Sequence, residues 1–266
     1  MAREILVTND DGYQAKGIRE LSKFLRQYGN VTVVAPREAQ SGKAASITLE
    51  RPLEIEQVEL ENARPAEGLR AYRMFTLTGT PVDCAKMGVN ILKSEGKYPD
   101  LLVSGINHGS NASSAALYSG TLGAAKEGIV YDIPSIGLSL DSIVPDPDFS
   151  ALLRYARIIF DKYFETGIAK GVYLNVNFPD IPFAQIKGIR LAHQGKGRWV
   201  NEFDHRVNPR GRHYFWMVGE FEDCEQTDAR DGDHRVVKDG YVSIVPHKVD
   251  TTDYDELDRL SSLWKF

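Results

Sequence analysis

The first third of the chain alternates short apolar runs with a segment of helical periodicity. Apolar and β-branched residues at 5–8 and 31–36 predict two buried strands, and turn-forming residues follow the first of them. Between these runs, apolar residues recur at Ile18, Leu21 and Leu25, which is the spacing of one helix face. A strand, a helix and a strand in succession predict two parallel strands joined by a crossover helix.

The same alternation continues to about residue 180. The patterns predict helices at 80–94, 120–131 and 149–163 and strands at 100–105, 133–140 and 172–179. Pro81 suits the first turn of its helix, where no N–H is required. We therefore expect residues 1–180 to form a doubly wound, Rossmann-like α/β core, with helices on both faces of a mostly parallel sheet in three layers.

The pattern changes after Pro179. Strand-like pieces at 186–193, 212–218 and 241–247 are separated by polar, charged stretches at 195–212 and 222–235. We expect residues 181–266 to form a β-rich extension or arm that ends in a short helix at 253–265 and belongs to the same overall domain. Exposed aromatic hairpins are typical of contacts between copies of a chain, so the pattern favours a homodimer or homotetramer.

Composition narrows the classes of partner. The chain is ordinary for a soluble globular protein, with 42% hydrophobic and 26% charged residues, and its formal net charge is -5. A duplex nucleic acid is therefore not expected as a partner, and an anionic ligand needs a local metal ion or helix terminus. No apolar run reaches the roughly 18 residues of a membrane span, and the N-terminal residues lack a signal-peptide pattern. We expect a cytoplasmic protein that binds no membrane.

Polar residues follow the first predicted strand, where a doubly wound sheet binds its ligands. Asp10 and Asp11 are adjacent in the sequence TNDDG. Two carboxylates side by side repel each other unless a cation or protons compensate them, so a divalent ion would reconcile the pair. A helix cap and a solvent-exposed turn explain this loop alone about equally well.

Two further loops at the same predicted edge carry candidate ligands. Ser41 lies in the loop at 35–46 and offers a neutral oxygen to a hard ion, although an ordinary flexible loop also fits. The sequence SGINHGSNASSAALYSGT follows the strand at 100–105 and contains Asn107, whose carbonyl oxygen is a possible metal ligand. Three consecutive residues then open a helix, as a phosphate site or as plain capping residues: Ser119, Gly120 and Thr121.

Several common sites are absent from the sequence. There is no GxxxxGK[ST] loop, no GxGxxG after the first strand and no GxSxG elbow. His and Cys are not clustered as in a zinc site. His108 is a possible proton donor, although a histidine on a surface loop is the simpler interpretation.

The motifs together resemble those of a known family. The sequences ILVTNDDGYQAKGI, QSGKAASIT, GTPVDC, VSGINHGSN and YSGTLGAAKEG occur in the order found in the SurE family, the survival protein E phosphatases. The likeness continues through LNVNFP, NPRGRHYFW and DGYVSIVPH, so it covers nearly the whole chain. The resemblance implies a metal-dependent 5'-nucleotidase that hydrolyses nucleoside 5'- and 3'-monophosphates to nucleoside and phosphate.

The resemblance also assigns roles to residues. It implies one divalent ion per subunit, Mg²⁺ or Mn²⁺, and Asp10 and Asp11 as catalytic residues. The implied metal ligands are Asp10, Asp11, Ser41 and Asn107. The implied residues near the phosphate are Asn111, Ser119, Gly120 and Thr121. The sequence NASSAAL at 111–117 departs from the usual family pattern, which bears on substrate preference.

Other functions compete with a nucleotidase for these motifs. A haloacid-dehalogenase-type phosphatase uses two aspartates separated by one residue, whereas Asp10 and Asp11 are adjacent. A metal-dependent amidohydrolase would normally recruit histidine ligands, which the first loop lacks. The main alternative is a noncatalytic regulatory module that binds a metal or a nucleotide.

Overall fold

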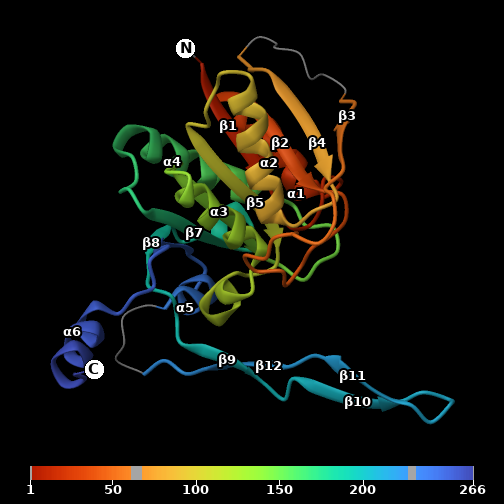
Figure 1. Ribbon diagram of the computed structural model, residues 1–266, viewed down its shortest axis with the longest axis vertical. Helices are drawn as coiled ribbons and strands as arrows, with labels where there is room; N and C mark the ends of the chain where they lie inside the picture. Colours follow the sequence, from red (N-terminus) through yellow and green to blue (C-terminus); the bar gives the residue numbers. More distant parts are fainter. Residues whose placement is uncertain (1, 61–67, 227–231, 266) are drawn as a thin grey trace.

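The fold is built on one large central sheet (Figure 1). The computed structural model describes residues 2–60, 68–226 and 232–265. Within those residues the sheet has nine strands in the order β3-β4-β2-β1-β5-β6-β7-β13-β8. Their bounds are β1 (Arg3–Thr8), β2 (Gly29–Pro36), β3 (Ile55–Val58), β4 (Tyr72–Leu77), β5 (Leu101–His108), β6 (Ser135–Asp141), β7 (Val172–Pro179), β8 (Ile189–Leu191) and β13 (Val242–Lys248).

The middle of the sheet is parallel. Neighbouring strands run parallel from β4 to β7, whereas β3 and β13 join antiparallel to β4 and β7. Strand β1 lies between β2 and β5, so the chain turns back through the sheet next to β1. This arrangement confirms the predicted doubly wound α/β fold, and it gathers the carboxyl ends of β1, β2 and β5 at one edge.

Helices cover both faces of the sheet. The helices are α1 (Lys16–Leu25), α2 (Pro81–Ser94), α3 (Gly120–Val130) and α4 (Ser150–Thr166). Leu21 of α1 and Phe160 of α4 belong to one buried cluster, whereas Leu92 of α2 and Ala124 of α3 belong to another. Because the two clusters lie on opposite sides of the strands, the core has the three predicted layers. No helix among the described residues is long and apolar enough to cross a membrane.

Local sequence explains where α2 starts. The side chain of Thr80 accepts a hydrogen bond from the Asp83 amide at 3.1 Å, and the Asp83 carboxylate accepts one from the Thr80 amide at 2.9 Å. This capping box satisfies two amides that the helix itself leaves unpaired. Pro81 occupies the first helical turn, as its sequence position predicts.

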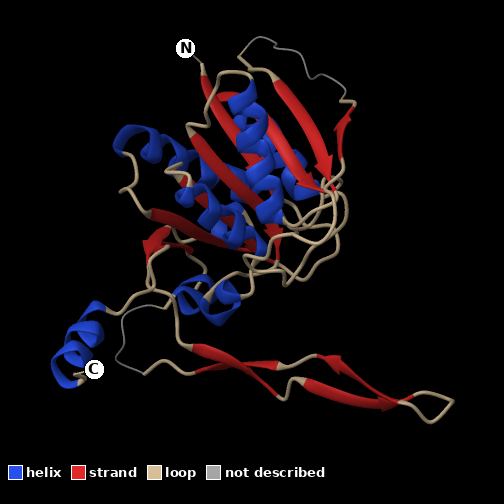
Figure 2. Cartoon of the chain, in the orientation of Figure 1, coloured by secondary structure: helices blue, strands red, loops and turns tan. Residues whose placement is uncertain are grey.

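A long arm built from two successive pairs of strands projects from the core (Figure 2). Its strands are β9 (Gly197–Val200), β10 (Phe203–Val207), β11 (His213–Met217) and β12 (Glu220–Asp223). Strand β9 pairs with β12 and β10 with β11, both antiparallel. The remaining elements are the short helices η1 (Ser113–Leu117), η2 (Phe183–Gln185) and α5 (Asp233–Lys238), and the C-terminal helix α6 (Tyr254–Leu263).

Three features of the C-terminal part differ from the sequence-based expectation. The polar stretch at 195–212 contains β9 and β10. The described part of 222–235 contains the end of β12 and the start of α5, and residues 227–231 lie outside the described residues. Strands β8 and β13 join the central sheet. An exposed ribbon buries neither face, so its strands show no apolar alternation that a sequence pattern can detect. Strands β3 and β4 were likewise not predicted.

Candidate active site

Four segments that are distant in sequence meet at the carboxyl edge of the sheet. The amide of Gln40 donates to the main-chain oxygen of Asp10 at 2.7 Å. The amide of His108 donates to Oδ2 of Asp11 at 3.0 Å. The hydroxyl of Thr121 donates to Oδ1 of Asp10 at 2.5 Å. The loops after β1 and β2, the end of β5 and the start of α3 therefore form one site around the two aspartates.

The start of α3 packs directly on Asp10. Asp10 is only 4% exposed and Thr121 is fully buried. A Cβ atom at Gly120 would lie 2.9 Å from Cβ and 3.1 Å from Oδ2 of Asp10, so only glycine permits this approach. The positive end of the helix dipole consequently lies beside a carboxylate, which it stabilises.

Burial makes the aspartate pair costly to ionise. Loss of hydration raises the pKa of Asp10 from 3.8 to about 6, with a further contribution from the neighbouring charge of Asp11. Burial also raises the pKa of Asp11, although the His108 amide opposes this. Asn9 beside them has a buried side-chain oxygen that accepts no hydrogen bond from a described residue. A cation fits these residues, because it would offset the repulsion and engage oxygen atoms that lack donors.

Asn107 lies at the end of β5 and is 9% exposed. It was expected in a loop after 100–105, but the strand continues to His108, with a register shift between Ser104 and Asn107 in its pairing with β6. Its side-chain nitrogen donates to the Gly109 carbonyl at 2.7 Å, which fixes the amide so that its oxygen remains for a ligand.

Ser41 lies in an exposed turn immediately after Gln40, whose amide is bonded to Asp10. The same loop is attached to the start of α3, because Ala44 donates its amide to the Tyr118 carbonyl at 3.0 Å. Ser41 therefore lies near Asp10, on a loop that hydrogen bonds attach to Asp10 on one side and to Tyr118 on the other.

No group of three or more His, Cys, Asp or Glu side chains suited to a metal ion occurs within the described residues. The predicted ligand set has only two acids, joined by a hydroxyl and an amide. All four groups offer oxygen atoms, and these are the ligands that Mg²⁺ and Mn²⁺ prefer.

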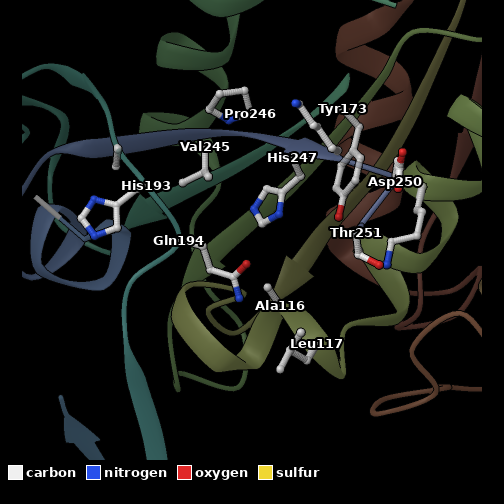
Figure 3. A pocket seen from close by; sticks show the side chains of 13 residues that line it. Ala116, Leu117, Tyr173, His193, Gln194, Val245, Pro246, His247, Asp250 and Thr251 are labelled. Carbon is white, nitrogen blue, oxygen red and sulfur yellow. The ribbon is translucent and has the colours of Figure 1, made fainter. Parts of the chain in front are cut away.

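A separate cavity of about 500 Å³ is lined by residues of η1, β7 and β13 (Figure 3). The rings of Tyr173 and His247 stack in it, with centroids 5.2 Å apart. These residues pair across β7 and β13 near the start of β7, and Ala116 and Leu117 line the cavity from η1. None of the residues predicted for the aspartate site lines this cavity.

Comparison with known proteins agrees with this geometry. Residues 5–201 match the model of the family described as Survival protein SurE. The chain belongs to the SurE family. It is 42% identical over 258 residues to the 5'-nucleotidase SurE of Phocaeicola vulgatus, covering 97% of this chain and 95% of that protein. It is 43% identical over 263 residues to the 5'-nucleotidase SurE of Cytophaga hutchinsonii, covering 98% and 97%.

A solved SurE structure has the same fold. The crystal structure of the SurE protein from Aquifex aeolicus superposes with a TM-score of 0.80 at 32% identity, covering 98% of this chain and 99% of that one. The likeness therefore extends through the C-terminal part, beyond the residues that the family model matches.

Within this SurE chain, the residues expected near phosphate are largely engaged by the protein itself. Asn111 donates its side-chain nitrogen to Ser139 and its main-chain amide to Asn177, each at 2.8 Å. Ser119 caps α3 by accepting from the Leu122 amide at 3.1 Å. Thr121 is bonded to Asp10. These side chains therefore hold the loop and the helix around the site in place.

Sequence patterns did not reveal two contributors. Thr121 was assigned to phosphate, and its bond to Asp10 was missed because nothing in local sequence reports a contact across 111 positions. Sequence patterns also give no sign of Asp233, which is fully buried and accepts hydrogen bonds from the amides of Ser113 and Gly195. A buried acid in a stretch of charged residues gives no distinguishing signal.

Proposed function

We propose that the protein is a divalent-metal-dependent phosphomonoester hydrolase that acts on nucleoside 5'- and 3'-monophosphates and releases nucleoside and phosphate. The buried Asp10 and its partly buried neighbour Asp11, where four segments of the chain meet, carry this proposal. The relatives named 5'-nucleotidase SurE, which align over nearly the whole chain, support it. The noncatalytic regulatory module is not favoured.

The ligand set proposed for one Mg²⁺ or Mn²⁺ per subunit is Asp10, Asp11, Ser41 and Asn107. When bound, the ion would neutralise charge on the phosphate during its transfer to water. The chain's own residues prepare the site: Thr121 orients the Asp10 carboxylate, and the His108 amide orients that of Asp11.

The remaining phosphate oxygens would lie against the first turn of α3. Gly120 lets this turn approach Asp10, and amides at a helix N-terminus favour an anion. Asn111, Ser119 and Thr121 keep their proposed place near the phosphate, with side chains that fix the surrounding loop and helix. Asp10 and Asp11 remain the proposed catalytic residues.

The direct test is phosphate release from a panel of 5'- and 3'-nucleoside monophosphates with Mg²⁺, Mn²⁺ or EDTA. We expect metal-dependent release that Asp10→Asn reduces by about a thousandfold or more, because loss of a charge at the reacting centre costs several kcal/mol. Asp258→Asn on exposed α6 is the matched control and should retain full activity. Nucleotide binding without any release would instead support the regulatory module.

We also propose that the arm joins copies of the chain into a homodimer or homotetramer. Phe203, Phe215, Trp216 and Met217 on β10 and β11 are each at least 59% exposed. Large apolar side chains gathered on one ribbon are typical of an interface. Light scattering after gel filtration tests this, and a monomer at micromolar concentration would contradict it.

A further inference from the structure

A second cavity, of about 390 Å³, opens between the core and the base of the arm. Ser110 and Ala112 line it from the loop after β5, and Asp141 lines it from the end of β6. Trp199 of β9 and Phe221 of β12 line its other side. Its volume lies in the range of small-molecule sites, about 300–1,000 Å³.

This cavity is linked to the aspartate pair through the ends of the neighbouring strands β5 and β6. His108, whose amide is bonded to Asp11, pairs with Leu140 on the neighbouring strand β6. Asp141 is the next residue after Leu140, and neighbouring strands lie about 5 Å apart. A molecule with its phosphate at the aspartates can therefore extend along these strand ends toward this cavity.

Buried polar contacts hold the arm in place beside the loop. Oδ1 of Asp233 accepts hydrogen bonds from the amides of Ser113, Gly195 and His234, at 2.9, 3.0 and 2.9 Å. Ser113 also donates its hydroxyl to the Gly195 carbonyl at 2.9 Å. The base of the arm and the loop after β5 thus form one rigid wall, since three donors converge on a single buried oxygen.

Aromatic rings form the arm side of the cavity. The rings of Trp199 and Phe221 meet edge to face with centroids 5.9 Å apart, and those of Phe221 and His234 do so at 5.3 Å. A Cβ atom at Gly197 would lie 2.2 Å from the Phe221 ring, so glycine is required for Phe221 to pack there. Trp199 nevertheless remains 43% exposed, which leaves ring surface for a ligand.

We propose that this cavity is the nucleoside subsite, in which the base packs on Trp199 and Phe221 and the Asp141 carboxylate accepts hydrogen bonds from the sugar hydroxyls. Aromatic side chains stack on any base, and acidic side chains commonly bind ribose hydroxyls. The inference rests on the proposed nucleotidase function and extends it, because it assigns base and sugar recognition to residues outside the metal site.

The kinetic test compares adenosine 5'-monophosphate with ribose 5-phosphate, which has the same phosphate and sugar but no base. Trp199→Ala should raise KM for the nucleotide about 5- to 100-fold and leave ribose 5-phosphate unchanged. Trp199→Phe should restore most of the loss, and Trp264→Ala at the end of α6 should behave as the native chain. Equal effects on both substrates, or no effect on either, would overturn the base assignment.

The sugar contact has its own test. Asp141→Ala should raise KM about tenfold for both substrates, because the lost acceptor faces a group that they share. Unchanged KM values for both would remove Asp141 from the subsite.

A binding test separates this inference from catalysis. In the variant Trp216→Phe/Trp264→Phe, Trp199 is the only remaining tryptophan. Adenosine, added with EDTA present, should quench its fluorescence saturably, and ribose should not. Saturable quenching in a chain that releases no phosphate would retain the nucleoside subsite and reject the nucleotidase. Absence of quenching up to millimolar adenosine, in a chain that does release phosphate, would reject the nucleoside subsite and retain the nucleotidase.

Discussion

The Thr121 hydroxyl donates to Oδ1 of Asp10 at 2.5 Å, and both residues are almost completely buried. This bond joins Asp10, in the loop after β1, to the first turn of α3. It favours the ionised form of Asp10, in opposition to the burial that raises its pKa. The charge and position of Asp10 therefore depend on a helix that lies 111 residues away in sequence.

Replacing Thr121 by valine removes the hydroxyl at nearly constant volume. We expect the pKa of Asp10 to rise further and phosphate release at neutral pH to fall about tenfold or more, because a hydrogen bond to a charged group contributes about 1.5–3 kcal/mol. Thr121→Ser keeps the donor and should retain most of the activity. Activity measured from pH 5 to 8 would show the Thr121→Val loss decreasing as pH rises; a uniform loss would contradict the role in ionisation.

Replacing Gly120 by alanine places a methyl group against Asp10. The added Cβ would lie 2.9 Å from that of Asp10 and 3.1 Å from Cγ of Pro81, so α3 must shift. We expect a loss of about 1–3 kcal/mol in the free energy of unfolding. We also expect a larger fall in activity than Val130→Ala causes. Val130→Ala at the exposed end of the same helix is the control. Native activity in Gly120→Ala would show that the close approach is not required.

The stability of the metal-free protein should fall as pH rises from about 4 to about 6. The folded pKa of Asp10, about 6, lies above its ordinary value of 3.8, so unfolding releases protons in that interval and ionisation opposes folding. The shift corresponds to up to about 3 kcal/mol. Urea unfolding with EDTA at pH 4.5 and 6.5 should show a smaller difference in Asp10→Asn than in the native chain.

Metal should reverse this loss at neutral pH. Millimolar Mg²⁺ or Mn²⁺ is expected to raise the melting temperature of the native chain at pH 7.5, since a ligand that binds only the folded state stabilises it by mass action. Asp10→Asn should be more stable than the native chain in EDTA and gain little from metal. An equal gain in both proteins would place the ion elsewhere.

Removing the Asp233 carboxylate should loosen the arm. Asp233→Ala leaves three amides without their acceptor, which should lower the free energy of unfolding by about 2–4 kcal/mol. Asp233→Asn keeps an oxygen at the same place and should lose less. Hydrogen exchange of the Ser113 and Gly195 amides would report the loosening directly; unchanged protection in Asp233→Ala would contradict the anchor.

The sequence by itself determined the α/β core. Strand β7 begins and ends where its apolar run predicted, and α2 starts at its Thr80 and Pro81 signals, because burial and capping act over a few residues. The sequence also identified the SurE family and the loops that bear Asp10, Ser41 and Thr121. The arm strands β9, β10 and β12 gave no comparable signal, since they bury neither face.

Only the tertiary structure decided how the loops combine. The order of strands places β1 between β2 and β5, so Asp10 meets Gln40 and Thr121, while the buried oxygen of Asp233 fixes the arm beside the site. Such contacts depend on which carboxyl ends become neighbours and on how much water the packed chain excludes. Hydrophobic periodicity carries no record of either, so the raised pKa of Asp10 and the cavity at Trp199 became visible only in the folded chain.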